Sequence, residues 1–511
     1  MYPFIAAVLP IVILWEANRA ELVPAGDVLP PIGLALVGAA IVLGLALLGY
    51  RERHRAAVAA SVVVVLFFTY GYAWTWARDA MPGVLASHAA VVVTWTVLAI
   101  MGIVAVRVWG RHAIRLTAPL NGFAALLLAL SLSSIGAYGL AARTDAVTGG
   151  DQLPFGGEVV RRPDIYWLIM DRYGSGDVLR RSYDFDNSPF LDALGERGFY
   201  VAEDATANYL KTALSLVSSR SMSYLDFDSL EGEAARGDDW GPFYRRLGAG
   251  FPVQEFLAGQ GYQFIYAGSY WSPTDANQAA DLNLRYEVAT TEFQDVLMDT
   301  TLLRAVTSVW NQELDWRLRR WQITRHQFEY LHETVELGGP KLVHAHVTLP
   351  HDPYVFRADG TFQSETAARG QSEEELYVAQ ARYANGELLR LVDRLLALPE
   401  NERPAIIIQA DEGPFPPRYR GTQEVAWAYA TDDELRDKFG ILNAFYLPGM
   451  DPEQAGLYPS ISSVNTFRVV LSAYFGVDLP LLPDRQFIYP EHANIYDQVE
   501  VTDRIAGTDS D

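Results

Sequence analysis

Long apolar segments dominate the first part of the chain. Four runs of 21 to 23 residues cover 28–50, 56–76, 84–106 and 120–142. Each run matches the roughly 20 residues that a helix needs to cross the hydrocarbon core of a bilayer. The shorter apolar segment 2–15 contains Pro10. It lacks the charged start and cleavage site of a signal peptide, so we do not expect it to be removed. We expect a fifth span there rather than an interfacial helix. Residues 1–143 are therefore predicted to be an all-α transmembrane domain.

The pattern changes after residue 162 to short apolar runs that alternate with helical periodicity. Continuous apolar runs predict buried strands at 165–170, 262–267, 341–347, 405–410 and 442–447. Helical spacing follows at 189–198, 253–261 and 373–398. Such alternation predicts an α/β fold with a mostly parallel sheet flanked by helices. The Gly-rich, polar stretch 144–162 is predicted to be a linker, and 163–511 the catalytic domain.

Charge separates the two parts further. Residues 1–143 hold nine Lys or Arg and five Asp or Glu, which gives them a net charge of about +4. The remainder has a net charge of about −26, so the whole chain has a net charge of −22. An acidic domain of this kind argues against nucleic acid as a partner. The chain has no cysteine, so neither disulfides nor thiolate chemistry are available to it.

Arginine placement predicts the orientation in the membrane. Positive residues gather at 51–55 and 107–115, and the remaining connections between the apolar runs are mixed in charge. Positively charged loops stay on the cytoplasmic side. With five spans, the N-terminus is then inside the cytoplasmic membrane and residues 163–511 are outside it.

The segment 310–330 combines tryptophan with arginine and allows two interpretations. An amphipathic helix with solvated arginines is the ordinary one, and we favour it. A helix at the lipid headgroups is the alternative, because Trp and Arg are both favoured there. The residues concerned are Trp310, Trp316, Trp321, Arg317, Arg319, Arg320 and Arg325.

Carboxylates follow two of the predicted strands directly. Asp171 ends the first strand, and Asp411 and Glu412 come after the run 405–410. The carboxyl ends of parallel strands meet in the crevice where open α/β sheets bind ligands. Three carboxylates share a small site as anions only if a cation holds them together. We therefore expect Asp171, Asp411 and Glu412 to bind one divalent metal ion.

Hydroxyl and imidazole groups accompany these carboxylates. Thr212 precedes a stretch that could begin a helix, whose N-terminus would attract a phosphoryl group. A threonine needs a metal or a base to become a nucleophile, and taken alone Thr212 is more simply an N-cap. His351 lies between Pro350 and Pro353, which would aim its ring. His344 and His346 share one face of a strand, either as a packed pair or as metal ligands.

Four motifs occur in an order that resembles a known superfamily. They are Met170-Asp171, Lys211-Thr212-x-x-Ser215, Pro350-His351-x-Pro353-Tyr354 and Asp411-Glu412-Gly413. The set resembles the sulfatase-like branch of the alkaline phosphatase superfamily. With a membrane anchor it is similar to lipoteichoic acid synthase and the lipid A phosphoethanolamine transferases.

The resemblance implies roles for individual residues. Thr212 would be the covalent nucleophile and a metal ligand, and Asp171 and Asp411 would be further ligands. His351 would contact the transferred group. We also expect Lys211, Asn208 and His346 to contact the substrate.

Two features depart from the family. Glu412 stands where the family usually has a histidine ligand, and all-oxygen ligation favours Mn²⁺, Mg²⁺ or Ca²⁺ over Zn²⁺. Sulfatases in this branch oxidise a Cys or a Ser to an aldehyde, which Thr212 cannot form, so the resemblance points to phosphoryl chemistry.

The sequence thus predicts a membrane-anchored, metal-dependent phosphotransferase or phosphodiesterase. Its expected partners are membrane lipids and an anionic ester in a lipid or a cell-envelope polymer. Two alternatives stay open: a sulfatase-like ester hydrolase on the same fold, and a catalytically degenerate domain that binds an envelope component.

Overall fold

The chain forms two compact units. The computed structural model describes residues 1–21, 23–81, 87–109, 113–144, 159–287, 290–310, 316–420 and 425–506. One unit comprises residues 1–144 and 288–319, and the other comprises 145–287 and 320–511. Each unit has hydrophobic clusters of its own. Most of the predicted linker, 145–158, lies outside the described residues.

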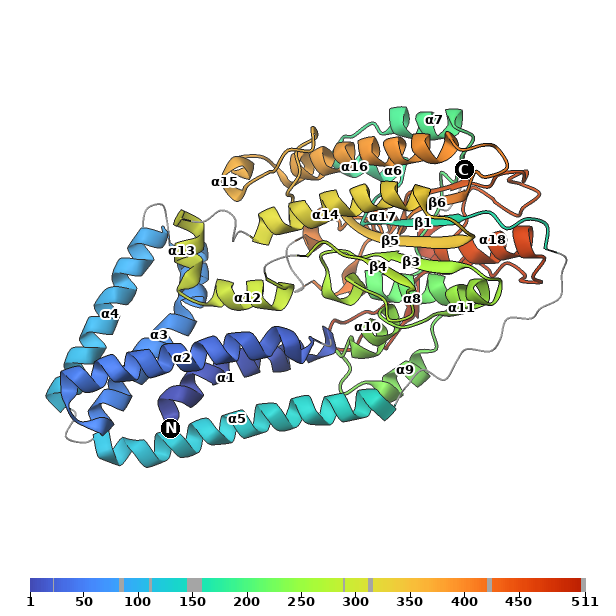
Figure 1. Cartoon of the computed structure of the whole chain (residues 1–511). Helices are drawn as coiled ribbons and strands as arrows, with labels where there is room; N and C mark the ends of the chain where they lie inside the picture. The colour runs from blue at the N-terminus through green and yellow to red at the C-terminus, as the bar shows by residue number, and fades with distance from the viewer. Residues whose placement is uncertain are drawn as a thin grey trace. The chain divides into compact units, whose positions relative to one another are not determined.

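The first unit is all helical (Figure 1). Its described helices are α1 (Tyr2–Ala17), α2 (Ala25–Tyr50), α3 (Arg53–Ala80), α4 (His88–Trp109), α5 (Ala113–Thr144), α12 (Glu292–Thr300) and α13 (Leu303–Trp310). Four of them, α2 to α5, are long and apolar enough to cross a membrane. The predicted helical membrane domain is therefore confirmed. The helix α1 is shorter, at 16 residues, and its role as a fifth span stays a prediction.

Helices α12 and α13 come from a distant part of the sequence but pack within the first unit. The Leu302 amide donates to the Phe67 carbonyl at 2.8 Å, and Gln294 Nε2 donates to the Asp27 carbonyl at 3.0 Å. Gly71 is required on α3, because a Cβ there would lie 2.0 Å from the Asp299 carbonyl oxygen. This insertion was not anticipated from the hydrophobic pattern.

The second unit is built on a mixed, mostly parallel sheet of seven strands in the order β2-β7-β6-β1-β5-β3-β4. Its strands are β1 (Ile165–Asp171), β2 (Tyr200–Val201), β3 (Gln263–Ala267), β4 (Leu282–Leu284), β5 (Lys341–Pro350), β6 (Ala405–Ala410) and β7 (Asn443–Tyr446), and β8 (Phe487–Ile488) pairs separately with β9 (Val499–Glu500). β1 pairs in parallel with both β5 and β6, whereas β7 runs antiparallel to β6. The predicted α/β class and parallel core are confirmed; the antiparallel edge was not foreseen.

Helices cover both faces of this sheet, with α14 and α16 on one side and α8 and α11 on the other (Figure 1). The helices of this unit are α6 (Gly176–Tyr183), α7 (Ser188–Glu196), α8 (Thr212–Ser221), α9 (Phe227–Glu233), α10 (Gly241–Leu247), α11 (Pro252–Gly259), α14 (Trp316–Glu333), α15 (Glu365–Ala368), α16 (Glu373–Leu396), α17 (Asp432–Phe439), α18 (Thr466–Phe475) and α19 (Thr502–Ile505). The long helix predicted at 373–398 is confirmed as α16. Ser372 and Glu375 form a capping box that stabilises its start.

Two arginines of α14 are not solvated, and for them the favoured interpretation is wrong. Arg319 is 3% exposed and forms an ion pair with Asp295. Arg320 is 6% exposed and donates to the carbonyls of Thr348 and His351 at 3.0 and 3.3 Å. Buried guanidinium groups need such partners. Residues 311–315 and the side chain of Trp310 lie outside the described part of the chain.

Candidate active site

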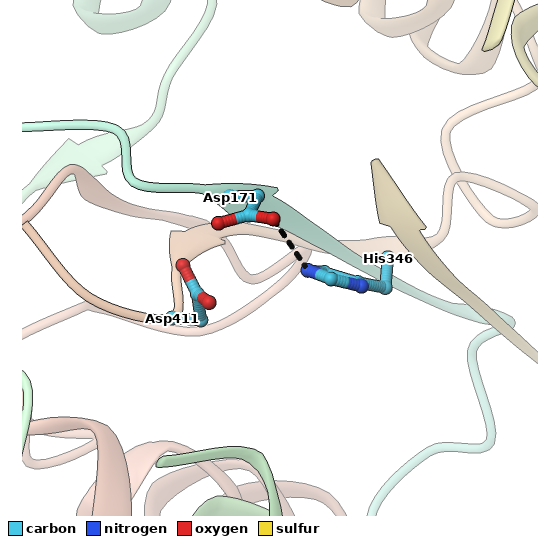
Figure 2. Close-up of side chains that lie close together, drawn as sticks. All are labelled: Asp171, His346 and Asp411. Atoms are coloured by element: carbon cyan, nitrogen blue, oxygen red, sulfur yellow. Dashed lines mark ion pairs between the residues drawn. The ribbon is translucent and has the colours of Figure 1, made fainter. Parts of the chain in front are cut away.

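Three adjacent parallel strands bring the central residues together. Ile169 of β1 lies opposite His346 of β5 on one side and Gln409 of β6 on the other. Asp171 ends β1 and Asp411 follows β6, so both carboxylates emerge at the same edge of the sheet as His346. One ligand atom from each of Asp171, His346 and Asp411 lies within 4.8 Å of the others, and all three residues are buried (Figure 2).

Each residue of this group has one ligand atom that lacks a hydrogen bond. Among the described residues, Asp171 Oδ1, Asp411 Oδ2 and His346 Nε2 are buried without a partner. Asp171 Oδ2 and His346 Nε2 are 3.7 Å apart, too far for a hydrogen bond. Buried polar atoms are nearly always paired. Three residues of suitable chemistry that lie close together, each with a buried unpaired ligand atom, fit a divalent cation.

His346 is prepared to act as a ligand through its second nitrogen. Its Nδ1 lies 3.0 Å from Thr274 Oγ1, which in turn lies 2.7 Å from Ser269 Oγ. A tautomer with the proton on Nδ1 leaves the Nε2 lone pair facing Asp171. Burial and the nearby positive charge of Arg220 lower the pKa of His346 to about 3. The ring is therefore neutral at pH 7, as metal ligation requires, and its orientation is fixed from behind.

Without a bound cation, the anionic forms of the two aspartates are electrostatically unfavourable. Burial and the charge of Asp411 raise the pKa of Asp171 well above its usual range. Burial and the charge of Glu412 raise the pKa of Asp411 to about 7, opposed by an interaction with the Thr212 hydroxyl. Asp411 Oδ1 is held by the amides of Arg172 and Glu412 at 2.9 and 2.7 Å. A bound cation would relieve this repulsion.

The structure places Glu412 in ion pairs beside this group. Its Oε1 lies 3.1 Å from Arg172 Nε and 3.0 Å from Lys438 Nζ. The side chains of Glu412 and Lys438 are 1% and 0% exposed. The three-residue group contains His346 and not Glu412, although the sequence predicted Glu412 as a ligand and His346 as a substrate contact.

Cations surround the ring of Phe415 next to these acids. Arg172, Lys211 and Lys438 lie 4.2, 4.4 and 4.0 Å from its centroid. Burial lowers the pKa of Lys211 to about 7 and that of Lys438 to about 8. Arg172 adopts a left-handed backbone with a φ of 59°, an unusual conformation for a residue with a side chain. The site thus combines buried carboxylates with positive groups suited to an anionic substrate.

Thr212 is the first residue of α8, and the N-cap position belongs to Lys211, which provides no side-chain cap. The ordinary role of Thr212 as an N-cap therefore does not apply. Thr212 is half-buried, and its hydroxyl interacts with the Asp411 carboxyl. The uncapped amides at the start of α8 offer donors to an anion beside this hydroxyl.

His351 lies at the same edge of the sheet with its side chain 23% exposed. Its Nδ1 contacts the carbonyl of Asp352. Burial and the charges of Arg172, Arg320 and Lys211 hold the pKa of His351 well below its usual range. The imidazole is therefore neutral at pH 7 and within the electrostatic reach of these three cations.

The remaining candidates are engaged elsewhere. The carboxamide of Asn208 donates to the Arg485 carbonyl at 2.9 Å and accepts from the Val464 amide at 2.9 Å. These bonds tie together the loops behind Thr212. His344 stacks on Trp167, with 4.3 Å between ring centroids, and contacts Arg220 at 2.9 Å. His344 is thus packed in the core, as the ordinary interpretation of the histidine pair expected.

The place of His346 in this group was the feature least accessible from sequence. The signal available was the alternation of β5, which turns His344 and His346 to one face. The two histidines differ in their position along the strand: His346 pairs with Ile169, near the end of β1, whereas His344 pairs with Trp167.

The chain was compared with known proteins and solved structures. No protein-family model and no curated protein matches the chain. Among solved structures, it resembles the C-terminal periplasmic domain of EcEptC from Escherichia coli, with 14% identity, a TM-score of 0.41 and coverage of 67% of this chain and 93% of that one.

A second match extends over the membrane part. Lipooligosaccharide phosphoethanolamine transferase A from Neisseria meningitidis, an integral membrane protein, shows 12% identity and a TM-score of 0.38, covering 92% of this chain and 95% of that one. A protein in the alkaline phosphatase superfamily from Vibrio parahaemolyticus shows 14% identity and a TM-score of 0.38, covering 69% and 80%.

Proposed function

We propose that this chain is a membrane-anchored, metal-dependent enzyme that transfers the phosphoryl group of an anionic ester through Thr212. One observation carries the proposal: three buried ligand atoms without partners lie next to a hydroxyl at an uncapped helix N-terminus. The Asp411 carboxyl links the two features, because it belongs to the group and interacts with Thr212.

Asp171, His346 and Asp411 would hold the cation, and Thr212 supplies a further oxygen. An imidazole nitrogen with carboxylate oxygens suits Zn²⁺ and Mn²⁺ as well as Mg²⁺. The all-oxygen set that favoured Mn²⁺, Mg²⁺ or Ca²⁺ over Zn²⁺ depended on Glu412, which is paired with Arg172 and Lys438 instead. When bound, the ion lowers the pKa of a coordinated hydroxyl and neutralises charge on phosphoryl oxygens.

The protein's own groups then account for the rest of the reaction. Thr212 Oγ forms a bond to phosphorus while the bond from phosphorus to the leaving oxygen breaks. The proton lost by Thr212 is balanced by the proton that the leaving oxygen takes up. Lys211 and the amides at the start of α8 stabilise the non-bridging oxygens. Neutral His351 carries its proton on Nδ1, which faces the Asp352 carbonyl, so its Nε2 can accept a hydrogen bond from the acceptor hydroxyl or water. An acceptor hydroxyl or water finally releases the phosphoryl group from Thr212.

The membrane unit supports the choice of substrate class. Four helices long and apolar enough to span a bilayer are part of the same chain as the site, so a lipid or a polymer attached to the membrane is locally concentrated. The arginines at 51–55 and 107–115 favour a cytoplasmic position for those loops. We accordingly propose that the catalytic unit acts outside the cytoplasmic membrane.

A covalent adduct tests this proposal directly. The full-length protein, loaded with Zn²⁺ or Mn²⁺, is incubated with vesicles of phosphatidylethanolamine and phosphatidylglycerol, quenched in acid and digested. Mass spectrometry of the peptide that contains Thr212 should show a phosphoryl adduct. Thr212→Ser should retain the adduct and Thr212→Ala should lose it, whereas Ser221→Ala at the other end of α8 should behave as wild type. An adduct that persists in Thr212→Ala, or its absence with both metals, would refute the threonine mechanism.

A further inference from the structure

The membrane unit contains an apolar cavity of about 450 Å³ between α2, α3 and α12, with α1 at its side. Its volume falls within the roughly 300–1,000 Å³ that is typical of small-molecule sites. Residues from α2, including Pro30 and Val42, form one wall, and Phe67 of α3 forms another. Leu297 and Met298 of α12 close the third side.

The walls offer no place for water. Among the described lining residues, three have polar side chains: Thr290, Gln294 and Thr301. Each polar group is already bound locally: Thr290 Oγ1 donates to Asp295 at 2.6 Å, Gln294 Nε2 to the Asp27 carbonyl at 3.0 Å, and Thr301 Oγ1 to the Met298 carbonyl at 2.8 Å. A buried water needs about two to four polar partners. The cavity therefore suits an apolar occupant.

The cavity is continuous with the exposed apolar surface of a predicted span. Leu34 lines the cavity and is 74% exposed. Val37 and Ile41, on the same helix, are 59% and 58% exposed. In a bilayer these side chains contact lipid tails, because α2 has the length and hydropathy of a membrane span. The apolar groups with direct access to the cavity are therefore acyl chains.

Small residues on α2 keep this space open. Gly38 lines the cavity, and a Cβ added there would meet no atom within 4 Å. Ala35 and Ala39 line it as well. On the opposite side, Phe293 and Leu297 anchor α12 in a buried cluster with residues of α1 to α3. The wall made by α12 is thus a fixed part of the unit.

We propose that this cavity binds one acyl chain of a membrane lipid, which enters from the side of α2. The site is made entirely by the membrane unit and does not depend on the catalytic role of Thr212.

Photolabelling tests the proposal. The full-length protein is reconstituted in phosphatidylcholine vesicles that contain a phosphatidylcholine with a diazirine on one acyl chain, irradiated and digested. Label should concentrate on the peptides that cover 290–303 and 30–42. Gly38→Leu fills the cavity and should reduce labelling of 290–303 by at least roughly tenfold. Gly44→Leu, on the same helix and also with open space at its Cβ, should label as wild type.

A second pair of variants fills the cavity from the opposite wall. Met298→Trp should reduce the label as Gly38→Leu does, and Val296→Trp, at a position 44% exposed on the same helix, should not. Circular dichroism confirms that each variant is folded. Equal labelling of 290–303 in all four variants would overturn the proposal, as would a wild-type protein that carries no label on this segment.

Discussion

Substituting Glu412 and His346 in separate variants tests which of the two side chains binds the metal ion. Glu412→Gln removes a charge at nearly constant volume, and His346→Gln removes the imidazole whose Nε2 faces Asp171. If the group of Asp171, His346 and Asp411 is the cation site, only the second change should abolish metal binding. Glu412→Gln should instead act on stability, because Glu412 is paired with Arg172 and Lys438.

The expected magnitudes follow from burial. Removing one partner of a buried ion pair costs about 3–5 kcal/mol, since it leaves an uncompensated charge. Lys438 is 0% exposed, so Glu412→Gln should lose about 3 kcal/mol at pH 7. That corresponds to a decrease in Tm of at least roughly 6 °C. The pKa of Lys438 is lowered to about 8, so this loss should shrink above pH 8, where Lys438 becomes neutral in both proteins.

For His346→Gln, metal affinity should fall by more than the roughly 10–100-fold that changes behind a ligand cost. Metal content of the purified protein by mass spectrometry of the elements, together with competition against a chelator, measures this. Thermal unfolding in detergent across pH 6–9 measures the effect of Glu412→Gln. A Glu412→Gln protein that loses its metal while His346→Gln keeps it would refute the assignment and restore Glu412 as the ligand.

Three further predictions concern protonation, the substrate and topology. Because burial raises the pKa of Asp411 to about 7, metal binding must displace a proton below that pH, and metal affinity should rise up to about tenfold per pH unit from pH 6 to 7. Calorimetry in buffers of different ionisation enthalpy should detect this proton release. Its absence would contradict the raised pKa. Lys211→Met should raise KM roughly tenfold, because it removes a charged donor. Lys211 has a pKa of about 7 and loses its charge above pH 7, so Lys211→Arg should keep activity there. An unchanged pH profile for Lys211→Arg would count against this role. In the cysteine-free chain, Glu402→Cys should react with an impermeant maleimide in intact cells and Glu52→Cys should not; the reverse pattern would place the catalytic unit inside.

Several elements were predictable because their signals are local. Apolar runs long enough to span a bilayer became α2 to α5, since hydrogen bonds within each helix satisfy the backbone whatever surrounds it. The run 405–410 became β6 with the predicted bounds. Asp171 and Asp411 could be predicted as site residues because a polar residue at the end of a buried parallel strand lies in the crevice at the carboxyl edge of the sheet.

Other features depended on partners distant in the sequence. Nothing in the periodicity of 290–310 distinguishes a helix of the catalytic unit from one that packs against α2 and α3. The segment packs in the first unit because Phe293 and Leu297 join a buried cluster with residues such as Ile11 and Phe68. The antiparallel direction of β7 was hidden for a similar reason, because strand direction is set by the connection and not by the strand's composition.

The division into an apolar helical part and an acidic α/β part was predictable from the sequence, as were the central strands and the carboxylates at their ends, because each follows from neighbouring residues and their hydropathy. The surroundings of Glu412 and His346 depend on contacts between distant parts of the sequence. The pairing of β1 with β5 brings His346 level with Ile169, two residues before Asp171, while Lys438 on α17 forms an ion pair with Glu412. The partners of both contacts are separated along the chain, and the packing of the sheet and its helices brings them together.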